Sequence, residues 1–186
     1  MAGRVCTNKV AAGFLARADL DGLGTLSPLQ RMLLACDGML TDMVEAAFGE
    51  PIRLIKIAVD TTPAGEAVKE LDLEAGAPMM RRQILLQGES SGVNYVFAES
   101  LIAVDALPPA LREALLQSDA PLGRLWVQHK LETRKEILRM WRTTVGESSR
   151  WFGAAGDAGQ LARSYRVFSS GRPIMLISEY FPVAST

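Results

Sequence analysis

The chain has 186 residues, 48% of them hydrophobic, and a formal net charge of −1. This length allows one domain with a full apolar core and is short for two. The balanced charge does not favour binding of nucleic acid or of an anionic membrane through bulk electrostatics, so an anionic ligand would need a local cation.

Cys6 and Cys36 are the only cysteines, too few to define a disulfide framework, and a reduced, cytoplasmic setting is the expectation. No apolar run approaches the roughly 18 residues that a membrane span needs. The N-terminus loosely resembles a signal peptide, but Arg17 interrupts its apolar stretch. We therefore expect a cytoplasmic protein without nucleic-acid or membrane partners.

The first 26 residues are rich in Gly and Ala. They are expected to be an N-terminal segment that is partly disordered. Residues 27–186 carry the periodic apolar patterns and are expected to form the domain.

Two short helices are predicted after this segment. Ser27 is placed to cap the first, with Pro28 in its first helical position. Asp42 and Glu45 have the spacing of a capping box for the second, and Gly49 is its expected end.

The strand signals follow in order. Residues 51–60 alternate between apolar and polar and predict a strand. Residues 79–87 and 93–104 flank a Gly/Ser turn and predict an antiparallel hairpin. Residues 163–168 and 173–181 predict a second hairpin around another such turn.

Two more helices are predicted between the hairpins. Residues 108–117 begin with proline, as helices often do. Residues 131–141 place Leu131, Leu138 and Trp141 along one helical face. Hairpins with interspersed helices predict an α+β fold: a single antiparallel sheet with helices packed on one side.

Two charged residues fall on apolar faces of the predicted strands. Side chains alternate along a strand, so Glu179 shares its face with Met, Ile and Phe side chains, and Arg82 shares its own with Met, Ile and Leu. The neighbouring Arg81 falls on the mixed face. A buried charge is retained only when it is paired or used.

Two interpretations of these charges remain open at this point. Arg82 and Glu179 could form a buried structural salt bridge, or one of them could reach water at a strand end. Alternatively they line an apolar pocket for a small aromatic or cyclic acid. Arg82 would then bind the ligand carboxylate, and Glu179 would hydrogen-bond a hydroxyl or move a proton.

His129 is the only histidine. One histidine and two distant cysteines do not make a zinc site, so no metal is expected. His129 is interpreted as a polar residue near a helix start.

Five stretches in order, RQILLQ, VFAESLIAVDALP, DAPLGRLW, HKLETRKE and YRVFSSGRPIMLISEYF, resemble chorismate pyruvate-lyase, the bacterial 4-hydroxybenzoate synthase. The resemblance is closest to the branch that supplies phenolic glycolipids. It runs from about residue 27 to residue 183. It implies an antiparallel sheet covered by helices, related to the UTRA ligand-sensing domains, with the ligand beneath flap-like helical segments.

The family splits chorismate into 4-hydroxybenzoate and pyruvate without metal or organic cofactor. By resemblance, Arg82 binds the ring carboxylate and the backbone of Leu122 helps to hold it. Glu179 contacts the hydroxyl end of the ring. A further backbone contact falls on Met39 or Leu40, because a one-residue gap leaves the alignment open there.

Two alternatives accompany this expectation. The chain could be a family member in secondary metabolism that acts on another carboxylate-bearing intermediate, because fold does not determine function. It could also be a non-catalytic module that binds aromatic acids, as the UTRA sensors do. The 26 residues before the matched region are too few for the DNA-binding domain that those sensors carry.

Overall fold

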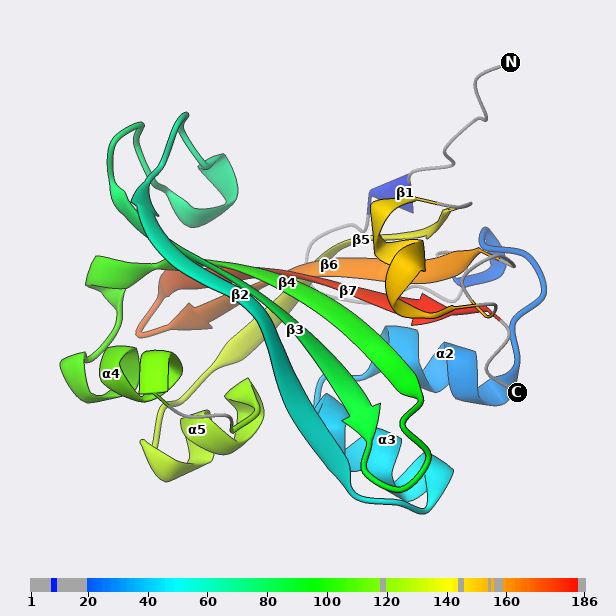
Figure 1. Cartoon of the computed structure of the whole chain (residues 1–186). Helices are drawn as coiled ribbons and strands as arrows, with labels where there is room; N and C mark the ends of the chain where they lie inside the picture. The colour runs from blue at the N-terminus through cyan, green and yellow to red at the C-terminus, as the bar shows by residue number, and fades with distance from the viewer. Residues whose placement is uncertain are drawn as a thin grey trace.

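The computed structural model describes residues 8–9, 20–117, 120–143, 146–153, 155 and 159–183. Within these ranges one antiparallel sheet has the strand order β1-β5-β6-β7-β4-β3-β2, and the long strands cross the molecule as a twisted layer (Figure 1). The strands are β1 (Asn8–Lys9), β2 (Ile52–Pro63), β3 (Pro78–Gly88), β4 (Asn94–Ala103), β5 (Arg134–Thr143), β6 (Gln160–Ser169) and β7 (Arg172–Pro182).

Four α-helices lie together on one face of this sheet (Figure 1): α2 (Pro28–Ala35), α3 (Leu40–Phe48), α4 (Pro109–Gln117) and α5 (Leu122–Gln128). The short 3-10 turns are η1 (Lys69–Leu71), η2 (Val104–Ala106) and η3 (Glu147–Trp151). Of these, η3 lies on the opposite face of the sheet. The predicted α+β fold with helices on one side is confirmed. No helix in the described ranges has both the length and the apolar character that a membrane crossing requires.

The helix starts agree in part with the prediction. Ser27 caps α2, and its hydroxyl accepts a hydrogen bond from the backbone N–H of Gln30 while the Gln30 side chain bonds back. Gly49 ends α3 in the left-handed conformation, with φ 69°, which glycine adopts without steric cost. The predicted capping box of α3 is wrong, because the helix begins earlier, at Leu40, after an uncapped Met39.

The sequence predicts a helix over residues 131–141, and this prediction is wrong. Most of the segment is β5, which pairs with β6 along its whole length. The register shifts between Ile137 and Arg139, and such a bulge inserts one residue and interrupts the alternation of side chains. Leu138 lies at this bulge, so the three-residue spacing of Leu138 and Trp141, which resembles a helix face, occurs here on an extended backbone.

The apolar core on the helix face has two parts. One cluster, beneath α2 and α3, includes Leu34, Val44, Ile84, Leu86, Val96, Ala98 and Phe181. The other, beneath α4 and α5, includes Met80, Ile102, Leu111, Leu115, Leu125, Tyr165 and Ile177. Arg82 lies on β3 between the two parts, so the boundary between the clusters is where polar groups interrupt the core.

The described part of the N-terminal segment packs against the first of these clusters. Leu20, Leu23 and Leu26 are all buried in it. The domain boundary at residue 26 stays a prediction, and residues 1–7 and 10–19 lie outside the described ranges.

Candidate active site

A cavity lies between the helix face of the sheet and the first turns of α3 and α5. The space open to the centres of water molecules is about 70 Å³, several times the ~10–15 Å³ that one water needs. Most lining side chains are apolar, among them Leu54, Ile84, Leu86, Val96, Ala98 and Ile177. The cavity is therefore an apolar compartment at the boundary between the two core clusters.

Arg82 and Glu179 both line this cavity. Arg82 of β3 stands opposite Ser100 of β4, and Glu179 of β7 stands opposite Ala98 of the same strand. Two strand spacings, roughly 10 Å, thus separate the backbones of the two charged residues. Their exposed fractions are 1% and 5%. The alternation of side chains along β3 and β7 predicts that Arg82 and Glu179 both face this side of the sheet, and the structure agrees.

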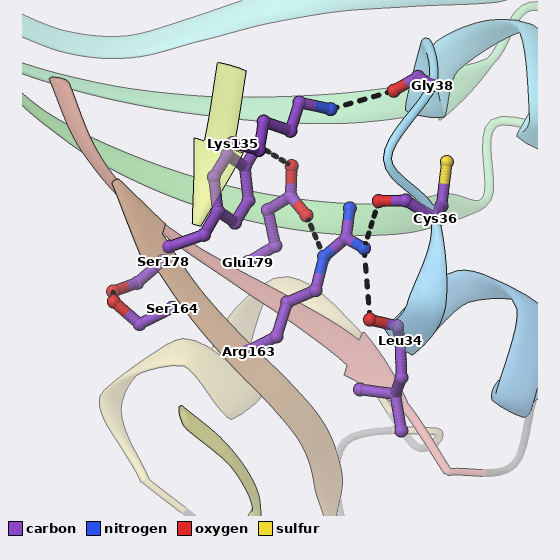
Figure 2. Close-up of polar contacts among 9 residues, drawn as sticks. Leu34, Cys36, Gly38, Lys135, Arg163, Ser164, Ser178 and Glu179 are labelled. Atoms are coloured by element: carbon purple, nitrogen blue, oxygen red, sulfur yellow. Dashed lines mark hydrogen bonds and ion pairs between the residues drawn. The ribbon is translucent and has the colours of Figure 1, made fainter. Parts of the chain in front are cut away.

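The carboxylate of Glu179 is held by two neighbours on β6. The Nε of Arg163 donates to its Oε2 at 2.6 Å, and the hydroxyl of Tyr165 donates to its Oε1 at 2.7 Å. Figure 2 shows the guanidinium of Arg163 beside the Glu179 carboxylate. The alternative of a structural salt bridge between Glu179 and Arg82 is therefore wrong, because the ion-pair partner is Arg163.

Arg163 also links the site to the end of α2. Its Nη1 donates to the carbonyl oxygens of Leu34 at 3.1 Å and of Cys36 at 2.7 Å. Burial lowers the pKa of Arg163, but Glu179, Tyr165 and Cys36 together raise it by more, so the pKa is raised. Burial, and then the Glu179 carboxylate, raise the pKa of Tyr165 well above its ordinary value. Its hydroxyl therefore keeps the proton that it donates.

The sequence analysis missed Arg163. The available signal was parity, since Arg163 alternates with Tyr165 and Val167 along β6, all of them buried. The choice of partner depends on the register between β6 and β7, which sets Arg163 directly opposite Glu179. No local pattern contains that register.

Lys135 of β5 lines the cavity as well and was also missed, because its segment had the wrong predicted structure. Its Nζ donates to the carbonyl oxygen of Gly38 at 2.8 Å, as Figure 2 shows. The same Nζ lies 5.4 Å from the ring centre of Tyr165 and 5.9 Å from that of Trp126. Burial lowers the pKa of Lys135, and the Glu179 carboxylate acts in the opposite direction.

The backbone positions implied by the family resemblance fall at two helix starts. Leu40 is the first residue of α3 after Met39, and Leu122 is the first residue of α5 after Pro121. All of them line the cavity. The first N–H groups of a helix have no acceptor within it and favour anions. Whether Met39 or Leu40 donates to a ligand stays a prediction.

The two helix starts approach each other closely. A Cβ on Gly123 would lie 3.2 Å from Cγ of Met39, so the missing side chain permits this contact. Arg124 Nη2 lies 3.2 Å from both carboxylate oxygens of Glu45 and 3.6 Å from Oδ1 of Asp42. These exposed ion pairs join α3 to α5 over the cavity.

The described residues contain no group of three or more His, Cys, Asp or Glu placed to hold a metal ion. His129 is exposed and lies at the end of α5 as its C-cap. The expectation that it lies near a helix start is wrong, because the helix predicted after it is a strand.

Comparisons with known proteins show a related family. A family model described as chorismate pyruvate-lyase Rv2949c-like matches residues 34–186. A chorismate pyruvate-lyase of Mycobacterium tuberculosis is 33% identical over 158 residues, which cover 81% of this chain and 78% of that protein.

Solved structures with the same fold are more distant in sequence. A GntR-family transcriptional regulator from Bacillus cereus has a TM-score of 0.57 at 9% identity and covers 73% of this chain and 94% of that one. The effector domain of PhnF from Mycobacterium smegmatis has a TM-score of 0.58 at 16% identity and covers 78% of this chain and 88% of that one.

These regulators show a likeness of fold alone, which confirms the expected kinship with ligand-sensing domains at that level. The sequence matches go further, because the family model spans most of the chain and a relative exceeds 30% identity. The chain belongs to the Rv2949c-like chorismate pyruvate-lyase family.

Proposed function

We propose that this protein is a lyase that cleaves chorismate to 4-hydroxybenzoate and pyruvate. The observation that carries the proposal is the placement of Arg82 and Glu179, buried on either side of β4 and facing one apolar cavity. A cation and a carboxylate on the two strands beside β4, both facing such a cavity, suit a ring that carries a carboxylate and, across from it, a hydroxyl.

Arg82 is assigned to the ring carboxylate, which its planar guanidinium can hold through two parallel hydrogen bonds. The N–H groups at the starts of α3 and α5 would add donors to the same anion. These contacts would hold the ring in one orientation, and positioning of this kind removes part of the entropic cost of reaching the transition state.

The chemistry is an elimination that makes the ring aromatic. The ether bond between ring carbon 3 and the enolpyruvyl oxygen breaks, and ring carbon 4 loses its hydrogen as a proton. Enolpyruvate leaves and takes up one proton to become pyruvate, so atoms and charges balance. Aromatisation supplies much of the driving force, so no cofactor is included in the proposal.

Glu179 is assigned to the hydroxyl on ring carbon 4. Glu179 forms an ion pair with Arg163, and a carboxylate is an acceptor only. Arg163 and Tyr165 use one hydrogen bond to each oxygen, and a carboxylate has about four acceptor positions. Glu179 can therefore accept from the ring hydroxyl and act as the base for the neighbouring proton.

The remaining expectations belong to the same proposal. We propose a cytoplasmic enzyme that acts on a small molecule and has no nucleic-acid partner. The free, buried thiol of Cys36 is compatible with a reducing compartment.

The test is a chorismate assay with purified protein and no added metal. Pyruvate and 4-hydroxybenzoate are expected in equal amounts. Arg82→Met should weaken 4-hydroxybenzoate binding about 10- to 100-fold, because it removes a charge-assisted contact. Arg81→Met is the matched control, since Arg81 lies on the other face of β3 and pairs with Glu99.

Glu179→Gln should lower turnover at least about 100-fold while 4-hydroxybenzoate still binds. Full turnover by this variant would contradict the assignment of Glu179 as base. A wild-type protein that binds 4-hydroxybenzoate but never converts chorismate would favour a sensor, or a family member with another substrate.

A further inference from the structure

Lys135 is a cation in the cavity. In the proposed binding mode, neither the ring carboxylate nor the ring hydroxyl of the substrate contacts it. An ammonium group has three donors, and one of them goes to the Gly38 carbonyl at 2.8 Å. Among the described residues, none of the ion pairs includes Lys135. The nearby Glu179 uses its two oxygens to bind Arg163 and Tyr165.

The charge of Lys135 indicates what kind of ligand would compensate it. Arg163 and Glu179 pair with each other, so that pair does not compensate Lys135. A charge in a mostly apolar cavity is stabilised by an opposite charge, which a ligand carboxylate beside Lys135 would supply. An acid whose one carboxylate binds Arg82 has none left for Lys135, whereas a ligand with two carboxylates has one for each.

The order of the strands spreads these charges across the sheet. In the sheet the relevant strands follow as β5-β6-β7-β4-β3, so the strands of Lys135 and Arg82 lie on opposite sides of the strand of Glu179. In chorismate the enolpyruvyl oxygen is on ring carbon 3, next to the carbon that carries the hydroxyl. With the ring carboxylate at Arg82 and the hydroxyl at Glu179, the enolpyruvyl group on the neighbouring carbon can extend toward Lys135.

A second donor lies near Lys135. The indole Nε1 of Trp126 is buried and has no hydrogen-bond partner in the described part of the chain. Trp126 and Lys135 line both the inner cavity and an adjoining outer hollow of about 500 Å³. They therefore stand where a group attached to the ring would approach the opening.

We propose that Lys135 binds the enolpyruvyl carboxylate and thereby selects a substrate with two carboxylates over acids with one. This inference rests on the proposed lyase function and extends it. The carboxylate would accept hydrogen bonds from the two remaining donors of the Lys135 ammonium. The product 4-hydroxybenzoate lacks this carboxylate, so Lys135 contributes to binding of the substrate and not of the aromatic product.

The test compares chorismate and 4-hydroxybenzoate on the same variants. Lys135→Met removes the charge and keeps an unbranched side chain one atom shorter, whereas Lys135→Arg keeps the charge. Lys130→Met is the control, because Lys130 lines only the outer hollow. The readouts are kcat and KM for chorismate, and the Kd for 4-hydroxybenzoate by calorimetry.

For Lys135→Met, kcat/KM for chorismate should fall about 10- to 100-fold, as for a lost charge-assisted hydrogen bond. The Kd for 4-hydroxybenzoate should stay within about twofold, as for a distant site. Lys135→Arg should recover part of the loss, and Lys130→Met should change neither value. Retained product binding also shows that the variants are folded.

Three results would overturn the inference. Lys135→Met could weaken both ligands by the same factor, which would place Lys135 at the ring. It could change neither kcat/KM for chorismate nor the Kd for 4-hydroxybenzoate, which would show that Lys135 does not bind the substrate. Or Lys130→Met could cause the same loss, which would indicate general electrostatic attraction and not a specific contact of Lys135.

A failure of the proposed function gives a different pattern. If the wild type does not convert chorismate, its Kd for chorismate is measured in place of kcat/KM. Weaker chorismate binding by Lys135→Met, with 4-hydroxybenzoate binding intact, would still support the role of Lys135 while the lyase assignment fails.

Discussion

The network around Glu179 combines buried charges with several hydrogen bonds. Arg163 is 0% exposed and donates to the Glu179 carboxylate and to the carbonyl oxygens of Leu34 and Cys36. Tyr165 holds the other carboxylate oxygen. Removal of two charges from water is costly, and the network offsets this cost only while it is complete. It fixes the direction in which the Glu179 carboxylate faces the cavity.

Arg163→Met should lower the free energy of unfolding by about 3–5 kcal/mol, because it leaves the Glu179 carboxylate buried without its cation. Denaturant titration followed by circular dichroism measures this value. The double variant Arg163→Met, Glu179→Leu should recover part of the loss, since no buried charge remains unpaired.

Arg139→Met is the control for this prediction, because Arg139 is an exposed arginine on β5; its effect should stay within about 1 kcal/mol, the value of its exposed contact with the Trp141 ring. A double variant as unstable as the sum of its single variants would show that the two residues do not act as a pair.

Among the elements, the turn between β3 and β4 is held by one carboxylate. Glu50 accepts hydrogen bonds from the Ser91 hydroxyl at 2.6 Å, the Tyr95 hydroxyl at 2.6 Å, and the backbone N–H groups of Ser90 and Ser91. These bonds, with the Ser91 hydroxyl first, lower the pKa of Glu50 from 4.5 to about 2. A Cβ on Gly88 would overlap the Glu50 carboxylate and the Ser91 hydroxyl, so this turn needs glycine for space.

Gly88→Ala should destabilise the protein by about 1–3 kcal/mol, because the added methyl group forces the carboxylate or the turn to move. Gly65→Ala is the matched control, since a Cβ there meets nothing within 4 Å, and its effect should be near zero or slightly stabilising. The measurement is the midpoint of thermal unfolding. Equal midpoints for the two variants would contradict the close packing inferred at Gly88.

The link between α3 and α5 covers the cavity. Arg124 joins α5 to α3 through Glu45 and Asp42, and its side chain is 46% exposed. Exposed ion pairs contribute only about 0–1 kcal/mol, so this link can break without loss of the fold.

Arg124→Gln should increase the dissociation rate of 4-hydroxybenzoate by about two- to fivefold, in line with the small energy of exposed pairs. The free energy of unfolding should change by less than about 1 kcal/mol. Stopped-flow displacement measures the rate. An unchanged rate would show that opening of the cavity does not involve separation of α3 from α5.

In the whole molecule, the cavity lies where the two apolar clusters meet. A ligand there contacts residues of both clusters, such as Ile84 of the first and Ile177 of the second. It also contacts the starts of α3 and α5. Binding should therefore stabilise the complete fold rather than one part of it.

At a concentration of 100 times its Kd, 4-hydroxybenzoate should stabilise the protein by about 2.7 kcal/mol. For a chain of this size that corresponds to a rise in Tm of about 5–10 °C. A single calorimetric transition that moves as a whole is the expected result. A shift equally large in Arg82→Met would show that the ligand binds elsewhere.

Much of the fold could be predicted from local sequence patterns. The hairpins β3–β4 and β6–β7 follow from alternating apolar and polar residues around short turns. The cap residue Ser27 followed by Pro28 predicts the start of α2. Parity along single strands was enough to place Arg82 and Glu179 on the cavity side. These features are determined locally because side-chain direction in a strand depends only on the backbone repeat.

Tertiary structure decided what depends on register between strands. The pairing of β5 with β6 makes residues 134–143 a strand despite their helix-like spacing, and so turns Lys135 toward the cavity. The pairing of β6 with β7 chooses Arg163, not Arg82, as the partner of Glu179. Register depends on hydrogen bonds and packing between segments far apart in the chain, so no local stretch of sequence contains it.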